Sequence, residues 1–112
     1  MEIDIRREGE VTVAAIEGSV DGMTAEDLTD RLTGRVEVGE TRLVADFSGV
    51  NYTSSAGLRA LLTTLKEARQ RGGDIRLAAV RPDVLRVLQL SGFTNILKLY
   101  DNVQAAVDSY AR

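Results

Sequence analysis

The stretch LVADFSGVNYTSSAGLRALL, residues 43–62, decides the fold because an apolar strand gives way to an amphipathic helix within it. The run 42–47 is short and almost continuously apolar, which is typical of a central strand buried on both faces. Leucines then recur at the i, i+3, i+4 and i+7 spacing of one buried helical stripe, at Leu58, Leu61, Leu62 and Leu65. The helix begins at Ser54 or Ser55 and ends at Gly72–Gly73, so the stretch predicts a β–α unit.

The residues before this unit predict a hairpin and a helix. The segments 3–8 and 11–18 have the pattern of strands and are joined by the tight turn EGE, so we expect the chain to open with a hairpin. Thr24 and Asp27 have the spacing of a capping box, which predicts a helix that starts at residue 24 and ends near Gly39.

The residues after the unit continue the alternation of strands and helices. The pattern predicts a strand over 74–80, a helix from Pro82 to Gly92, a strand over 96–100 and a last helix capped by Asp101. The order is therefore β-β-α-β-α-β-α-β-α. Such an order predicts an α/β fold, with one domain over residues 1–112 and a mixed, mostly parallel sheet of about five strands with four helices.

The composition excludes several kinds of site. The chain contains no cysteine and no histidine, which removes thiolate chemistry, Ser-His-Asp catalysis and the usual zinc sites. A net charge of −3 argues against direct binding to nucleic acid. No signal peptide or membrane-length apolar run is present, so we expect a cytoplasmic protein without a membrane partner.

The charge is unevenly distributed along the chain. Residues 1–56 carry 12 acidic and 5 basic side chains, whereas residues 57–112 carry 5 acidic and 9 basic ones. Two explanations are open. The uneven charge is chance variation on a solvated surface, or the protein has one acidic and one basic side and docks on a partner of matched polarity.

No enzyme emerges from the remaining motifs, and no cofactor or metal is expected. The glycines form neither a P-loop nor a dinucleotide-binding fingerprint. Asp46 stands near the end of a strand, where a phospho-acceptor or magnesium ligand is conceivable, but no acidic pair completes such a site. We therefore interpret Asp46 as a carboxylate that accepts from nearby backbone donors.

Ser54 and Ser55 stand at the start of the central helix, where two roles are open. A serine at this position is a common N-cap for the unsatisfied N–H groups of the first turn. The same N–H groups and the helix dipole also favour a phosphate. Gly57 is expected to leave the approach open, and Arg59 follows Ser55 by four residues on the same helical face.

The chain resembles the STAS-domain family of bacterial anti-sigma factor antagonists over essentially its whole length. Residues 17–25, EGSVDGMTA, resemble the second strand, the G-x-x-D turn and the start of the first helix of that family. Residues 43–62 resemble its buried strand, its Asp-x-Ser segment and its serine loop, and residues 84–107 its closing helix, strand and helix.

The resemblance implies a partner-switching function. Single-domain members bind an anti-sigma factor that is also a serine kinase, and this binding frees the sigma factor. Phosphorylation of a loop serine ends the binding, and a serine phosphatase of the metal-dependent type restores it. The alternative is an unphosphorylated STAS scaffold or regulatory subunit of a transporter or signalling complex.

The resemblance also assigns the site residues. Aligned on Gly57–Leu58, the acceptor serine of the family falls on Ser55, with Ser54 as the second choice. Ser54 stands where the family frequently has aspartate, and Asp21 matches the aspartate of the G-x-x-D turn. The partner-binding surface expected from this alignment comprises Asp21, Ser54, Ser55, Ala56, Gly57, Leu58 and Arg59.

Overall fold

The predicted strands and helices are all present in the computed structural model, which describes residues 1–111. The elements are β1 (Glu2–Glu8), β2 (Val11–Val20), α1 (Ala25–Glu37), β3 (Arg42–Thr53), α2 (Ser55–Gln70), β4 (Asp74–Ala78), α3 (Pro82–Leu90), η1 (Phe93–Asn95), β5 (Lys98–Tyr100), α4 (Val103–Asp108) and η2 (Ser109–Ala111). The predicted α/β class and the element order are confirmed.

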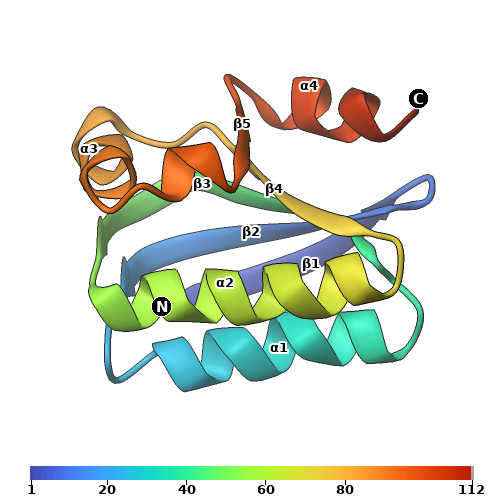
Figure 1. Cartoon of the computed structure of the whole chain (residues 1–112), viewed down its shortest axis with the longest axis horizontal. Helices are drawn as coiled ribbons and strands as arrows, with labels where there is room; N and C mark the ends of the chain where they lie inside the picture. The colour runs from blue at the N-terminus through green and yellow to red at the C-terminus, as the bar shows by residue number, and fades with distance from the viewer. Residues whose placement is uncertain (112) are drawn as a thin grey trace.

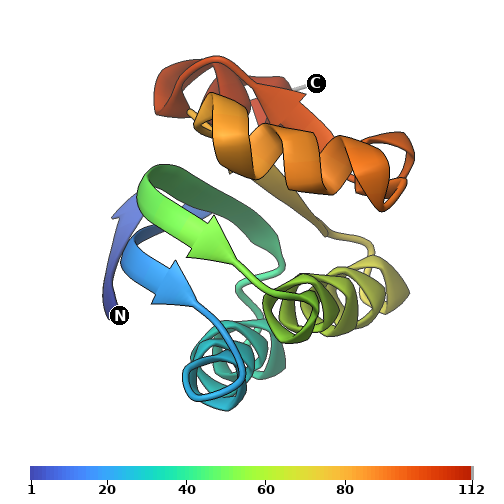
Figure 2. The ribbon, with the colours of Figure 1, turned by 90° about the vertical axis from the view of Figure 1, so that its left-hand side faces the viewer.

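The five strands form one sheet in the order β1-β2-β3-β4-β5. The β1–β2 hairpin is antiparallel, and every later pairing is parallel. Helices α1 and α2 lie side by side on one face of the sheet, and α3 and α4 lie on the other face (Figures 1 and 2). None of the helices in the described chain is long and apolar enough to cross a membrane.

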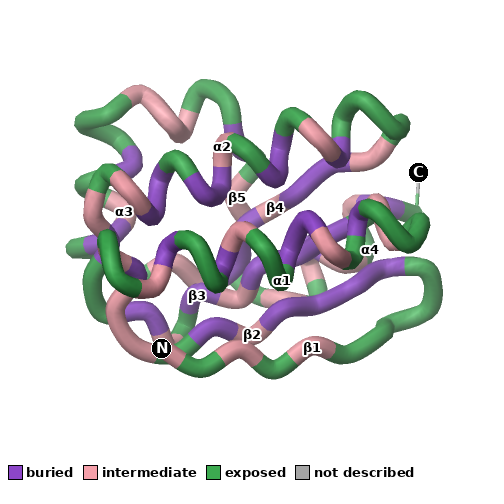
Figure 3. Tube along the Cα trace, turned by 90° about the horizontal axis from the view of Figure 1, so that it is seen from below, coloured by how far each residue is buried: buried purple, intermediate pink, exposed green. Residues whose placement is uncertain are grey.

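The core lies on both faces of the sheet. Buried residues recur along α1, α2 and the inner strands, whereas β1 is exposed or only partly covered (Figure 3). The larger apolar cluster joins α1 and α2 to the sheet and extends to α3, and a smaller one lies beneath α4 around Val13, Val44 and Ala106. Leu62 is only half-buried, contrary to the predicted stripe, since the face of α2 that meets the core is centred on Leu61 and Leu65.

Strand β3 is twice as long as its apolar run predicts. It continues through polar residues to Thr53 because β2 also continues, and the two pair as far as Val20 and Thr53 with two register shifts. Asp46 Oδ1 accepts from the Ser48 N–H at 3.0 Å, which confirms the interpretation of Asp46 as a carboxylate serving backbone donors. Gly49 permits the close approach of β2, because a Cβ there would lie 2.7 Å from Glu17 Cγ.

The last helix is capped one residue later than predicted. Asn102, not Asp101, is the N-cap of α4, and its Oδ1 accepts from the Ala105 N–H at 2.8 Å. Asp101 follows β5 directly and is one residue further from α4. The side chain of Asn102 is therefore the one that reaches an N–H group in the first turn of the helix.

Candidate functional site

The predicted site residues meet at one edge of the sheet. Strands β2 and β3 are parallel and end at this edge, where α1 and α2 begin (Figure 2). The Ser54 N–H donates to Val20 O at 2.9 Å and so joins the two connections. We call this surface the rim, and it comprises residues 21–24 and residues 52–59.

Asp21 closes the turn between β2 and α1. Its Oδ1 accepts from the Met23 N–H at 2.9 Å, and its backbone oxygen accepts from the Ala25 N–H at 2.8 Å. The Asp21 N–H donates to Thr24 Oγ1 at 2.9 Å, and that hydroxyl lies 3.1 Å from the backbone oxygen of Ser19. The capping box predicted for Thr24 is therefore wrong, because its hydroxyl turns back to the loop and makes no bond with the helix.

Ser54 is the N-cap of α2 by position only. Its backbone is extended, with φ −98° and ψ 176°, and its oxygen accepts the first helical bond from the Leu58 N–H. Its hydroxyl makes no capping bond, although the position predicts one. Within residues 1–111, Ser54 Oγ is the one buried side-chain polar atom that has no hydrogen-bond partner.

Ser55, the first residue of α2, differs from its neighbour in being exposed to solvent. Arg59 is exposed one turn further along, and in the described part of the chain it forms no ion pair. The first turn of α2 contains no acidic residue. Ser55 therefore presents a hydroxyl beside unsatisfied N–H groups and the positive end of the helix dipole.

Gly57 and Leu58 form the buried base of the rim. Both are buried, and Ala56 is half-buried against the core. A Cβ at Gly57 would lie 2.5 Å from Thr53 Oγ1 and 2.8 Å from Val20 Cγ1. The expectation that Gly57 clears the approach to the serine is therefore wrong; the glycine instead lets α2 pack closely against the end of β2.

Two exposed apolar residues at this edge were not predicted. Met23 is 94% exposed in the β2–α1 turn, and Tyr52 is 54% exposed near the end of β3. Met23 lies between the turn aspartate and the start of α1, and no apolar residue follows it at helical spacing. This isolation was the one sequence signal available for Met23. Tyr52 could not be assigned because the predicted strand ended before it.

The groups with altered pKa values lie elsewhere. The Tyr110 hydroxyl is buried, lies 2.7 Å from Leu43 O and 2.8 Å from Asp74 O, and shares its proton between these two acceptors. Burial raises the pKa of Tyr110, and the carboxylate of Asp74 raises it further. The guanidinium of Arg76 stacks 3.9 Å from the Tyr110 ring centre, so this cluster fixes the C-terminal segment on the sheet.

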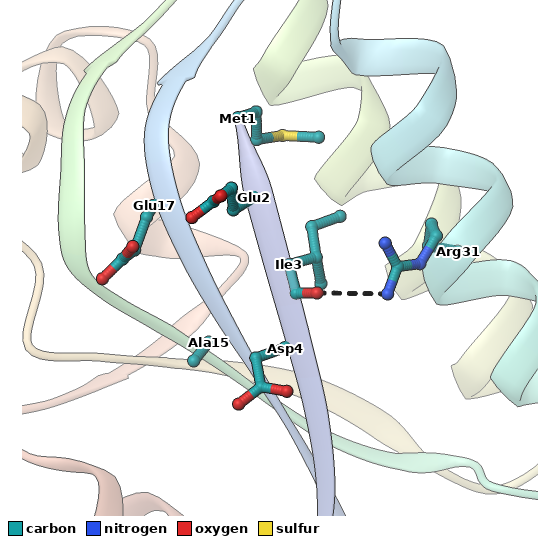
Figure 4. Close-up of a pocket in the computed structure, with 7 residues that line it drawn as sticks. All are labelled: Met1, Glu2, Ile3, Asp4, Ala15, Glu17 and Arg31. Atoms are coloured by element: carbon teal, nitrogen blue, oxygen red, sulfur yellow. Dashed lines mark hydrogen bonds between the residues drawn. The ribbon is translucent and has the colours of Figure 1, made fainter.

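A groove of about 580 Å³ passes the start of β1. In Figure 4 the carboxylates of Glu2, Asp4 and Glu17 lie on one side of this strand, and Arg31 lies on the other, where it donates to Ile3 O at 3.1 Å. Carboxylates dominate the open side of the groove, which makes it unsuitable for a phosphate-bearing ligand. In the described chain no three acidic side chains are grouped to hold a metal ion.

Comparison with known families identifies the domain to which the rim belongs. The profile of the STAS domain matches residues 2–106. The chain belongs to the STAS domain family. The resemblance found in the sequence is thereby confirmed.

Two curated relatives place this STAS domain among the anti-sigma factor antagonists. BtrV of Bordetella bronchiseptica, a candidate anti-sigma factor antagonist, is 36% identical over 98 residues, which cover 88% of this chain and 84% of BtrV. The anti-sigma F factor antagonist of Paenibacillus polymyxa is 24% identical over 103 residues, which cover 91% of this chain and 88% of the relative.

Solved structures share the fold. A candidate anti-sigma factor antagonist of Thermotoga maritima superposes with a TM-score of 0.93 at 21% identity, covering 98% of this chain and 95% of the other. The Bacillus protein SpoIIAA in its phosphorylated form superposes with a TM-score of 0.77 at 19% identity, covering 97% of this chain and 99% of SpoIIAA. At these identities the likeness concerns the fold alone.

Proposed function

We propose that this STAS domain is an anti-sigma factor antagonist controlled by phosphorylation of Ser55. In the unmodified state the rim binds an anti-sigma factor serine kinase, and the sigma factor is released. Phosphorylation of Ser55 by that kinase ends the binding, and a metal-dependent serine phosphatase restores it.

The observation that carries the proposal is the difference between the two serines. A kinase must bring its phosphate donor to the attacking hydroxyl, so the acceptor must be open to solvent. Ser55 is exposed, whereas Ser54 Oγ is buried. This difference supports Ser55 as the acceptor, independently of the alignment on Gly57–Leu58.

The start of α2 is also suited to hold the product. Among the four α-helices within residues 1–111, α1 and α3 have acidic residues in their first turns, and α4 has a side-chain cap. Helix α2 has neither. A phosphate on Ser55 would supply the missing negative charge and acceptors, with Arg59 one turn away. We therefore expect the modified protein to keep its fold.

The phosphate would oppose binding through its charge. It adds about 1.5–2 negative charges at neutral pH, and these must be desolvated in any closely packed complex. Asp21 belongs to the same rim and adds a like charge. A difference of about 3 kcal/mol in binding free energy is enough to weaken the complex more than a hundredfold. The solved phosphorylated form of SpoIIAA supports the proposal, because a protein of the same fold carries phosphate.

The test uses the wild type, Ser54→Ala and Ser55→Ala. Each protein is incubated with ATP and with each of the anti-sigma factor kinases encoded in the same genome, and the phosphate is located by mass spectrometry. We expect modification of the wild type and of Ser54→Ala at Ser55, and none of Ser55→Ala. Wild-type levels of phosphate on Ser55→Ala, or no phosphate on the wild type with any kinase, would reject the switch and favour the unphosphorylated scaffold.

A further inference from the structure

The rim carries two apolar side chains that the fold does not use. Met23 is 94% exposed and Tyr52 is 54% exposed, and neither belongs to the apolar core clusters. Both stand where β2 and β3 end, and large apolar side chains exposed beside a candidate binding surface are typical of residues that a partner covers.

Both side chains project from backbone that is held in place. Asp21 Oδ1 accepts from the Met23 N–H, and Thr24 Oγ1 accepts from the Asp21 N–H. Tyr52 stands opposite Ser19 in the β2–β3 pairing. A partner that binds these side chains therefore restricts their rotamers but need not order the loops, and this keeps the entropic cost of binding low.

The charges around Met23 define the occupant. Residues 21–30 contain four acidic residues and no basic one, and the acidic residues are Asp21, Glu26, Asp27 and Asp30. All but Asp21 are exposed. A second copy of this chain would place acid against acid at this surface, so charge disfavours self-association through it. A basic protein surface is complementary.

We propose that Met23 and Tyr52 are the apolar anchors of the complex with the anti-sigma factor kinase, that is, the side chains that bind in its apolar pockets. This proposal rests on the proposed function. The kinase surface that receives them has apolar pockets surrounded by basic side chains. Methionine and aromatic residues are enriched at the centres of protein interfaces, where a few side chains account for most of the affinity.

The anchors give the phosphorylation of Ser55 a physical effect on binding. Ser55 shares the rim with both of them, and the bond from the Ser54 N–H to Val20 O holds the two connections together. A phosphate added here must either be buried next to apolar contacts or hold the kinase away from them. Either outcome costs affinity without a change in the shape of the domain.

The experiment compares two rim variants with two matched controls. Met23→Gln and Tyr52→Gln remove the proposed anchors. Val38→Gln and Leu90→Gln change side chains that are 70% and 80% exposed but lie outside the rim, one at the end of α1 and the other at the end of α3. Affinity for the unmodified protein is measured by calorimetry with the kinase that phosphorylates the wild type, and melting temperatures are measured for all variants.

We expect each rim variant to weaken binding about tenfold or more, and each control to stay within about twofold, with melting temperatures near that of the wild type. If both rim variants bound the kinase with wild-type affinity, the proposal that Met23 and Tyr52 are anchors would be refuted, whereas the Ser55 switch would be unaffected. Equal weakening by the controls would also overturn them, because general surface hydrophobicity would then be responsible. If the wild type binds and is phosphorylated by none of the kinases, the proposed function fails and the anchors fail with it.

Discussion

Replacement of Gly57 by alanine tests how α2 is seated on the sheet. Within a helix, a change from glycine to alanine normally stabilises a protein by about 0.5–1 kcal/mol. At Gly57 the new Cβ would lie 2.5 Å from Thr53 Oγ1, 2.8 Å from Val20 Cγ1 and 2.9 Å from Val20 O. One of these atoms is backbone and the other two belong to stiff β-branched side chains, so the contacts cannot relax cheaply.

The expected change follows from these two terms. Overpacking of a well-packed site costs about 1–3 kcal/mol, and the helix preference of alanine offsets about 0.5–1 of this. We expect Gly57→Ala to lower the free energy of unfolding by about 0.5–2 kcal/mol. For a domain of this size the melting temperature should fall by roughly 2–8 °C.

Gly34→Ala is the matched control. Gly34 is also inside a helix, α1, but a Cβ there would have no atom within 4 Å. We expect this variant to be more stable than the wild type by about 0.5–1 kcal/mol. Thermal and urea denaturation followed by circular dichroism measure both variants. If Gly57→Ala stabilised the protein as much as Gly34→Ala does, the close contact between α2 and β2 would be refuted.

Three further changes test single features. Ala79 has φ 56°, a left-handed conformation that costs an alanine about 1 kcal/mol. Ala79→Gly should therefore raise the midpoint of denaturant unfolding, and a lower midpoint would show that the backbone of Ala79 is not strained. Ser54→Ala should lower the free energy of unfolding by less than about 0.5 kcal/mol, whereas the loss of a helix cap typically costs ~1 kcal/mol. A decrease of the full ~1 kcal/mol would mean that the hydroxyl does cap α2. Tyr110→Phe removes the donor to Leu43 O and Asp74 O and should cost about 1–3 kcal/mol. The folded-state pKa of Tyr110 lies above its ordinary value of 10.0. The contribution of its hydroxyl to the free energy of unfolding is therefore complete below pH 10.0 and declines as the pH rises through the folded-state pKa. A phenylalanine variant that loses as much stability at alkaline pH as the wild type would contradict this.

Much of the fold could be predicted because local patterns and tertiary structure agree. The leucine stripe, the glycines after α2 and the proline at the start of α3 each specify an element that the structure contains. The length of β3 could not be predicted, because its polar second half is a strand only through pairing with β2. Leu62 shows the same limit, since helical spacing identifies a face but tertiary packing decides how far that face is covered.

The structure brings the predicted site residues together at the end of β2 and β3, but their arrangement there depends on tertiary contacts. Sequence spacing could not tell which of two adjacent serines is exposed, because the answer depends on how the end of β3 meets the end of β2. The role of Gly57 was missed for the same reason: the atoms that require a glycine belong to Thr53 and Val20. Met23 was missed because its one sequence signal, the lack of a periodic apolar partner, does not show whether a loop side chain is exposed or buried.

The most direct test of the central claim is the affinity of the anti-sigma factor kinase for two forms of this protein, unmodified and phosphorylated on Ser55 alone. Calorimetry gives the two dissociation constants, and circular dichroism shows whether the phosphorylated protein is still folded. The account predicts a native spectrum for both forms and binding weakened more than a hundredfold by the phosphate. Equal affinity of the two folded forms would contradict it.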